Sequence, residues 1–227
     1  MKKERISEIF QQEGFNITDK QVQQFEEYYN FLVEENEKYN LTAITDFEDV
    51  VYKHFIDCGV GINFFEGKVL DIVSGAGFPG IVLAILNDKL QITLVDSLNK
   101  RVNFLNQLIE KLQLKNVKAI HARAEEFKEK ESFDRVTARA VANLSTLSEY
   151  LLPFVKMNGK AIIYKGADFF EEVESAQNAI SELGCQIEEI KRYRYLDNTR
   201  SIIVLRKIKH TPSKYPRSGN QPRKNPL

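Results

Sequence analysis

Two periods of hydrophobic residues divide the chain. In the first 65 residues, apolar side chains recur every three or four positions, as on one face of a helix. This spacing predicts a short helix within residues 1–14, a longer one from Thr18 to about residue 38, and a third that starts near residue 47. Thr18 has the residue type of an N-cap. We therefore expect an N-terminal helical extension over residues 1–65, packed on the rest of the chain.

From residue 68 onward, short apolar runs alternate with amphipathic stretches. This alternation predicts a mainly parallel sheet with helices on both faces. The expected strands cover residues 69–72, 91–96, 117–122, 133–138 and 160–165, and the expected helices cover residues 79–86, 100–114, 144–152 and 167–183.

The last part of the chain departs from this rhythm. Residues 185–195 and 200–206 are two more strand-like runs, separated only by Leu196-Asp197-Asn198-Thr199. So short a connection suits a hairpin loop and not a helical crossover. We predict an α/β fold: a doubly wound, mostly parallel seven-stranded sheet that ends in an antiparallel hairpin. This ending favours the class I S-adenosylmethionine-dependent methyltransferase fold over a nicotinamide-binding one.

The composition is typical of one domain with appendages. At 227 residues and 43% hydrophobic content, the chain can bury a core. We expect a Rossmann-like core over residues 66–208 and a tail over residues 209–227. No apolar run approaches the roughly 20 residues of a membrane helix, and no signal peptide is recognisable, so we expect a soluble cytoplasmic protein. Cys58 and Cys185 lie far apart, which predicts reduced thiols and no metal site.

The charge is zero overall but unevenly distributed. Residues 206–227 hold seven basic residues and no acidic one, namely Arg206, Lys207, Lys209, Lys214, Arg217, Arg223 and Lys224. Such an asymmetry indicates a polyanionic partner. The tail also holds four of the six prolines, so we expect it to be extended rather than helical. A disordered, solubilising tail is the alternative.

A glycine-rich turn follows the first expected strand, at Asp71-Ile72-Val73-Ser74-Gly75-Ala76-Gly77-Phe78-Pro79-Gly80. Glycines let the backbone approach a nucleotide-like cofactor closely, next to a helix N-terminus. The spacing Gly75-x-Gly77-x-x-Gly80 matches dinucleotide sites. Enzymes that use S-adenosylmethionine usually show Asp/Glu-x-Gly-x-Gly-x-Gly, and in that pattern Val73 replaces a glycine.

Ligands of open parallel sheets collect at the carboxyl ends of the strands. Asp96 ends the second expected strand and stands 21 residues after Gly75, near the spacing at which an acidic residue meets ribose hydroxyls. The next three strands end in His121-Ala122-Arg123-Ala124-Glu125, Thr137-Ala138-Arg139-Ala140 and Tyr164-Lys165-Gly166. Together these ends predict a ligand site.

Simpler roles stay open at four of these positions. Asp96 could cap the following helix, and Glu125 could be a solvated acid at a helix start. Arg123 and Arg139 could each pair with a nearby acid.

Three more residues have two possible roles each. His54 and Asp57, three residues apart on a helix, could bond to each other or contact a substrate. Phe78 could be core, but its place in the turn favours a pocket wall.

A set of short motifs runs through nearly the whole chain in a specific order. They are Asn40-Leu41-Thr42, His54-x-x-Asp57, Val69-Leu70-Asp71, the glycine turn, Leu94-Val95-Asp96-Ser97-x-Asn99-Lys100-Arg101, Arg123-Ala124-Glu125, Arg139-Ala140 and Lys165-Gly166. In this order they resemble the bacterial small-subunit rRNA guanine-N7 methyltransferase family, also called glucose-inhibited division protein B.

The resemblance implies S-adenosylmethionine as methyl donor and one guanine of 16S rRNA, near the decoding region, as acceptor. It places the cofactor against Val73, Phe78, Ala124, Glu125 and Arg139, to which the glycine turn adds Gly75 and Gly77 and the ribose spacing adds Asp96. RNA would meet His54, Lys100, Arg101, Arg123, Lys165 and the tail residues Lys214, Arg217, Arg223 and Lys224.

The implied chemistry agrees with the residues that are missing. Guanine N7 presents a free lone pair, so methyl transfer requires no general base and no covalent nucleophile, only donor and acceptor held in line. No cysteine follows the fourth expected strand, as pyrimidine C5 methylation would need, and no Asp/Asn-Pro-Pro-aromatic tetrad follows it either. We expect positioning by Arg139, Lys165 and Arg123, in a monomeric enzyme without metal.

Two other functions are compatible with parts of the sequence. An rRNA-binding protein of the same fold, impaired in methyl transfer by Val73, is the first. A nicotinamide-dependent oxidoreductase is the second, but it leaves Ala124-Glu125, the final hairpin and the basic tail without a role.

Overall fold

The computed structural model describes residues 1–139, 142–167, 169–195 and 198–227. Its centre is a seven-stranded sheet in the order β3-β2-β1-β4-β5-β7-β6. The strands are β1 (Lys68–Ile72), β2 (Gln91–Asp96), β3 (Val117–His121), β4 (Phe133–Arg139), β5 (Val155–Lys165), β6 (Cys185–Tyr195) and β7 (Asn198–Lys207). The five strands from β1 to β5 are all parallel to their neighbours in this group, whereas β7 pairs antiparallel with both β5 and β6. The predicted fold class is confirmed.

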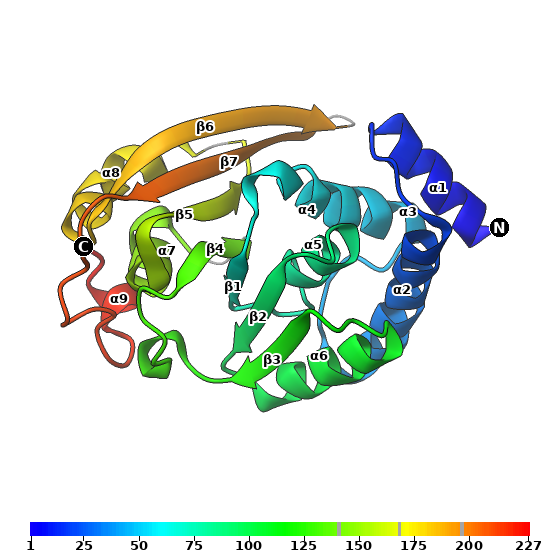
Figure 1. The fold of residues 1–227 in the computed structure, drawn as a ribbon, viewed down its shortest axis with the longest axis horizontal. Helices are drawn as coiled ribbons and strands as arrows, with labels where there is room; N and C mark the ends of the chain where they lie inside the picture. Colours follow the sequence, from blue (N-terminus) through cyan, green and yellow to red (C-terminus); the bar gives the residue numbers. More distant parts are fainter. Residues whose placement is uncertain (140–141, 168, 196–197) are drawn as a thin grey trace.

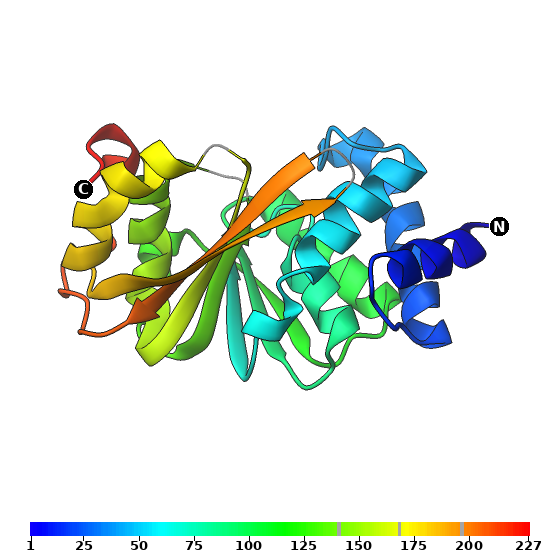
Figure 2. The same cartoon turned by 90° about the horizontal axis from the view of Figure 1, so that it is seen from above.

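Helices cover both faces of the sheet (Figures 1 and 2). The longer ones are α1 (Lys2–Gln12), α2 (Asp19–Tyr39), α5 (Gly80–Leu86), α6 (Asn99–Lys111), α7 (Leu144–Leu151) and α8 (Phe170–Glu182). One hydrophobic core joins α1, α2, α5 and α6 to the sheet, and a second joins α7 and α8 to it. The alternation of strands and helices in the sequence produces these two layers.

The N-terminal extension packs directly on the core. Thr18 accepts a hydrogen bond from the Gln21 N–H, so it is the predicted N-cap of α2. Further along that helix, the Gln24 amide donates to the Leu112 carbonyl oxygen at 2.8 Å, and the Tyr28 hydroxyl donates to the Ala76 carbonyl oxygen at 2.6 Å. The second of these bonds ties α2 to the glycine turn.

Two expected elements differ from the observed ones. The third helix is not one α-helix: α3 (Phe47–Val50) passes into a π-helical segment, η1 (Val51–Ile56), and then α4 (Asp57–Gly59). A wider turn changes which later residues share a face, and hydrophobic spacing does not report it. β5 begins at Val155, five residues earlier than expected. The hydrophobic pattern does not predict this start, because polar Lys156 and Asn158 interrupt the apolar run. Leu196 and Asp197 of the expected hairpin loop, and Ala140, lie outside the described residues.

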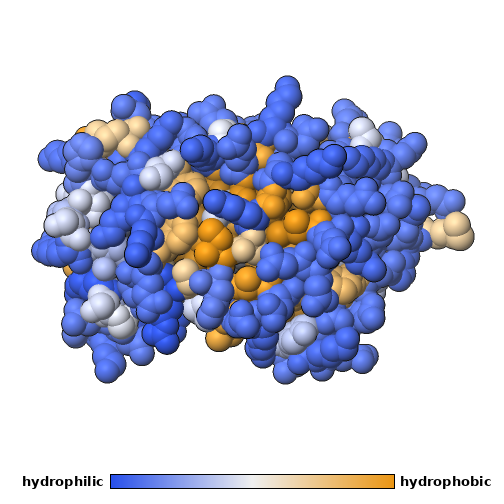
Figure 3. Space-filling view, turned by 60° about the horizontal axis from the view of Figure 1, so that its bottom comes forward, coloured by the Kyte–Doolittle hydropathy of each residue, from blue (hydrophilic) through white to orange (hydrophobic). Residues whose placement is uncertain are grey.

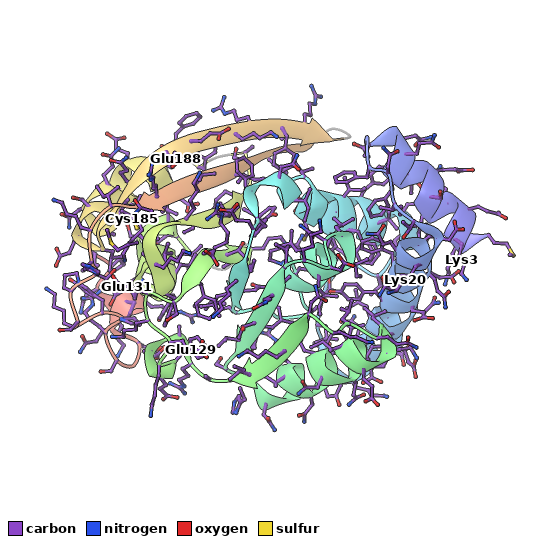
Figure 4. The ribbon with its side chains drawn as sticks, viewed as in Figure 1. Lys3, Lys20, Glu129, Glu131, Cys185 and Glu188 are labelled. Atoms are coloured by element: carbon purple, nitrogen blue, oxygen red, sulfur yellow. The ribbon has the colours of Figure 1, made fainter. Side chains whose placement is uncertain are left out.

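The last strand ends at a buried cation. Lys207 is fully buried, and its Nζ donates to the carbonyl oxygens of Leu152 at 2.9 Å and Leu183 at 3.2 Å. Glu131 Oε1 lies 3.5 Å from the same Nζ. Figure 4 shows Glu131 and Cys185 at this end of the molecule, away from Lys3 and Lys20. The remaining short helices are η2 (Ile62–Phe64), η3 (Ala124–Glu126), η4 (Leu152–Phe154) and α9 (Gln221–Lys224).

Among the described residues, no helix is long and apolar enough to cross a membrane. Figure 3 shows one side of the molecule, where hydrophobic residues gather in the middle and hydrophilic residues surround them.

Candidate functional site

The glycine turn connects the carboxyl end of β1 to α5. Its first residues are held by β2, because the N–H groups of Val73 and Ser74 donate to the Val95 carbonyl oxygen at 2.8 and 3.3 Å. Val73, Gly75 and Gly77 have φ angles of 62°, 58° and 97°. Glycine adopts this left-handed region without strain, whereas a β-branched residue such as valine does so at a cost. Val73 thus stands where the methyltransferase pattern has glycine, and it also has a backbone conformation that favours glycine.

The glycines of the turn have different roles. A Cβ atom added to Gly75 would meet no atom closer than 4.0 Å, so Gly75 borders open space in which a ligand could lie. A Cβ atom on Gly80 would collide with Leu94 and lie 2.8 Å from Asp71, so Gly80 lets α5 pack closely on the sheet. The backbone around Gly75 therefore fits a cofactor, and Gly80 supports the fold.

Two buried carboxyl groups shape the turn. Asp71 accepts a hydrogen bond from the Gly80 N–H at 2.9 Å, and burial raises the pKa of Asp71 well above its usual range. Asp96 accepts from the N–H groups of Gly75 and Leu98, both at 2.9 Å, and from Arg101 at 3.4 Å. Leu98 is the N-cap of α6, so the alternative that Asp96 caps this helix is wrong. Asp96 binds the glycine turn itself, and its contact with ribose stays a prediction.

Arg139, at the end of β4, is the centre of a buried polar cluster. Its Nη1 donates to the Lys53 carbonyl oxygen at 2.9 Å and to Asp57 Oδ2 at 3.1 Å, and its Nη2 lies 2.9 Å from His54 Nδ1. The alternative that Arg139 pairs with a nearby acid is confirmed. No hydrogen bond joins His54 to Asp57 directly; both bind Arg139, which brings η1 and α4 against the end of β4. The Tyr193 hydroxyl also donates to Asp57 Oδ1, at 2.9 Å.

His54 is held in its neutral form. Burial, and then the nearby Arg139 charge, lower its pKa to about 3. His54 Nδ1 lies 2.9 Å from Arg139 Nη2 and 3.0 Å from the Lys53 carbonyl oxygen, and Nε2 lies 3.0 Å from the Thr42 hydroxyl oxygen. Both ring nitrogens are thus engaged within the protein, and His54 is not poised to remove a proton.

Phe78 combines the two roles that the sequence left open. It belongs to the core cluster, with its ring 5.3 Å from the Tyr28 ring, and it lines a hollow beside the glycine turn. The His54 ring is tilted against it, with ring centroids 4.5 Å apart, and the Arg139 guanidinium lies 4.9 Å from the centre of the Phe78 ring. These contacts fix the orientation of both polar side chains.

Two hollows flank Val73. One, of about 220 Å³, is lined by Leu41, Thr42, His54, Val73, Ser74, Gly75, Ala76, Phe78, Arg101 and Arg139. The other, of about 280 Å³, is lined by Ile72, Val73, Val95, Ser97, Leu98, Ala122, Arg123, Ala124, Glu125, Tyr150, Asn220 and Arg223. Each is smaller than the roughly 300 Å³ at which small-molecule sites begin. Together they hold most of the predicted cofactor residues, with Val73 between them.

Comparison with known proteins identifies the family. The sequence model of a family described as rRNA small subunit methyltransferase G matches residues 21–203. The chain belongs to the rRNA small subunit methyltransferase G family. A member from Oceanobacillus iheyensis is 47% identical over the full length of both chains, and one from Clostridium botulinum is 48% identical over 94% of both.

Solved structures place the family within a known fold. M. jannaschii TYW2 in complex with AdoMet has a TM-score of 0.51 and 16% identity, over 64% of this chain and 71% of that one. A mutant form of the 16S rRNA (adenine(1408)-N(1))-methyltransferase from Catenulisporales acidiphilia has a TM-score of 0.53 and 13% identity, over 70% and 93%. At these identities the likeness concerns the fold alone.

Some of the predicted RNA-binding residues are engaged within the protein, whereas others are exposed. Lys165 is engaged, because its Nζ donates to the Ala142 carbonyl oxygen at 2.7 Å and to Glu172 at 2.5 Å. Arg123 lies beside the larger hollow and forms no ion pair with a described residue, so the alternative of a salt bridge is wrong there. Glu125 is half-buried in the same hollow, so it is not a fully solvated acid.

The remaining basic candidates lie on the surface or in the tail. Lys100 donates to the Tyr39 carbonyl oxygen at 3.3 Å, and Arg101 pairs with Asp96. In the tail, Lys214 pairs with Glu182 at 3.1 Å and Arg217 with Glu149 at 2.6 Å, whereas Lys224 is exposed. The tail contacts α7 and α8 and contains the short helix α9, so the expectation that it is extended rather than helical is wrong at residues 221–224.

Sequence reasoning missed two residues that support the site. Tyr28 was one member of an apolar stripe, and only the structure reveals that its hydroxyl holds the glycine turn. Glu149 is fully buried in α7 as the partner of Arg217. The sequence carries no clear signal for Glu149, because polar Ser145 and Thr146 precede it by four and three positions on the same face of α7.

Proposed function

We propose that this protein transfers a methyl group from S-adenosylmethionine to N7 of one guanine in 16S rRNA. Membership in the rRNA small subunit methyltransferase G family supports rRNA as substrate. The glycine turn at the carboxyl end of β1 supports a nucleoside cofactor, and the final hairpin supports the methyltransferase form of the fold. A monomer acting in the cytoplasm, where ribosomes are found, is part of the proposal.

The two hollows divide the cofactor between them in this proposal. The adenosine part would lie against Ala124 and Glu125, beyond β2 and β3, as in other nucleotide-binding sheets. The methionine part would lie against Gly75, Phe78 and Arg139. The cofactor, when bound, supplies a methyl group activated by a positively charged sulfur. The Gly75 backbone leaves the space for it, and the packed ring of Phe78 excludes water from one side.

The Arg139 cluster is the observation that favours an acceptor with a free lone pair, such as guanine N7. His54, beside the methyl-donor hollow, is neutral and bonded through both nitrogens. Arg139 pairs with Asp57, which also lies 3.8 Å from Arg200, so this carboxylate offsets part of the positive charge beside the hollow. An acceptor that must lose a proton would gain nothing from these groups. An acceptor with a free lone pair needs only the positioning that they provide.

Transfer of labelled methyl from S-adenosylmethionine tests the activity. The substrate is 16S rRNA, naked or in small subunits, from a strain that lacks the enzyme. We expect the wild-type protein and an Arg206→Ala control, altered far from both hollows, to label it, and Arg139→Ala to lose most of the signal. Absence of label with the wild-type protein on every form of the substrate would contradict the proposal.

A further inference from the structure

The C-terminal segment, residues 211–225, is anchored on α7 by a buried ion pair. The Arg217 guanidinium donates to Glu149 through Nε and Nη2, at 2.9 and 2.6 Å, and the Arg217 backbone N–H donates to the same carboxylate at 2.7 Å. The Glu149 side chain is only 1% exposed. A bidentate pair to a buried carboxylate fixes orientation as well as position.

Three more contacts extend this anchor along the segment. Tyr215 is buried, and its hydroxyl donates to Glu182 at 2.6 Å. The Thr146 hydroxyl donates to the Pro222 carbonyl oxygen at 3.1 Å, and Arg217 Nη2 donates to the Asn225 carbonyl oxygen at 2.8 Å. These bonds lie before, within and after α9, so this short helix has a fixed place beside α7 (Figure 1).

The position of α9 makes the segment part of the larger hollow. Asn220 and Arg223 line it together with Val73, Ala124 and Glu125, which come from the ends of β1 and β3. Tyr150 of α7 lines the same hollow and has the Arg223 guanidinium beside its hydroxyl group. The strand ends thus form one side of this hollow, and the C-terminal segment forms another.

We propose that the C-terminal segment is a wall of the cofactor site, in which Asn220 and Arg223 contact the adenosine part of S-adenosylmethionine. This inference rests on the proposed function. The hollow is the one bordered by Ser97 and Leu98, directly after Asp96, and by Glu125, where a nucleoside is expected. A guanidinium plane stacks well on a nucleobase, and an asparagine amide can bond to ring nitrogens.

The basic residues of the tail suggest contact with RNA, but most of them are already engaged within the protein. Arg217 and Lys214 are paired with acids of α7 and α8, and Arg223 faces the cofactor hollow. Lys224, the next residue, is exposed and does not line the hollow, which makes it a matched control of the same charge. If the tail binds RNA, substitution of Arg223 and of Lys224 should weaken RNA binding similarly. If the tail is a wall of the cofactor site, only substitution of Arg223 should weaken cofactor binding.

Calorimetric titration of the full-length protein with S-adenosylhomocysteine, in the absence of RNA, tests the proposal. We expect Arg223→Ala to weaken binding about tenfold, Asn220→Ala to weaken it several-fold, and Lys224→Ala to leave it unchanged. Arg217→Ala, which releases the anchor, should weaken binding although Arg217 itself does not line the hollow. Circular dichroism spectra and melting curves verify that each variant is folded.

Wild-type affinity in folded Arg223→Ala and Asn220→Ala would overturn the inference. Loss of rRNA binding in Arg223→Ala and Lys224→Ala alike, with unchanged cofactor affinity, would overturn it in favour of RNA contact. A wild-type protein that binds no S-adenosylhomocysteine would instead overturn the proposed function, and the inference with it.

Discussion

Replacing Val73 by glycine is expected to tighten cofactor binding while changing stability little. Val73 has a φ of 62°, and a left-handed backbone costs a non-glycine residue about 1–3 kcal/mol. Glycine removes this strain, but its greater freedom in the unfolded chain costs about 0.5–1 kcal/mol. Loss of the half-buried valine side chain costs roughly another 1 kcal/mol. These terms nearly cancel, so the free energy of unfolding should change by no more than about 1.5 kcal/mol in either direction.

The effect on binding has a separate origin. Val73 lines both hollows, and we expect a cofactor that spans both to displace its side chain. If that displacement costs about 1–2 kcal/mol, Val73→Gly should lower the dissociation constant of S-adenosylhomocysteine about 5- to 30-fold. Methyl transfer at low cofactor concentration should rise by a similar factor.

Two control variants separate side-chain volume from backbone strain. Val73→Ala removes the γ-methyl groups but keeps a Cβ atom at positive φ, so it should recover most of the affinity and lose stability. Asn158→Gly relaxes another left-handed residue, with φ of 64°, on β5 far from the hollows, and should leave affinity unchanged. Equal dissociation constants for wild type, Val73→Ala and Val73→Gly would refute the reasoning and make Val73 an ordinary variation.

Two further predictions concern the Arg139 cluster. Because the folded protein holds the pKa of His54 at about 3, against about 6.5 in an unfolded chain, only the unfolded chain gains a proton between these values. The contribution of the neutral His54 to the free energy of unfolding is complete above pH 6.5, and it falls by about 1.4 kcal/mol per pH unit toward pH 3. A His54→Gln variant should lack this pH dependence in chemical denaturation. Equal pH dependence in the wild type and the variant would contradict the prediction. Asp57→Asn leaves the Arg139 charge buried and should cost about 3 kcal/mol in the same assay, whereas Glu188→Gln, a half-exposed partner of Lys160, should cost less than about 1 kcal/mol. Similar losses in both variants would disagree with the burial argument.

Much of the fold could be predicted because each layer follows from local pattern. The apolar runs of the central strands and the short connection between the last two strands specify the sheet and its antiparallel ending. The π-helical segment η1 could not be predicted, since hydrophobic spacing does not distinguish an occasional wider turn. The start of β5 at Val155 could not be predicted from hydrophobic spacing, because polar residues that face solvent interrupt the first half of the strand.

The site could be predicted less completely. Strand ends and turn glycines gather at one edge of a parallel sheet, so Gly75, Glu125 and Arg139 line hollows beside Val73 as the topology requires. The partners of buried charges could not be predicted, because they come from elements distant in sequence. Arg139 meets Asp57 from the helical extension, and Arg217 meets Glu149 from α7.

Analysis of the methylated nucleoside tests the central claim most directly. After transfer of labelled methyl to 16S rRNA, digestion to nucleosides and mass spectrometry identify the modified base and the position of the methyl group. The neutral His54 predicts an acceptor with a free lone pair, and the proposed function predicts that the single product is guanosine methylated at N7. Label on an exocyclic amine, a pyrimidine carbon or a ribose hydroxyl would contradict the account, since each of these acceptors must lose a proton.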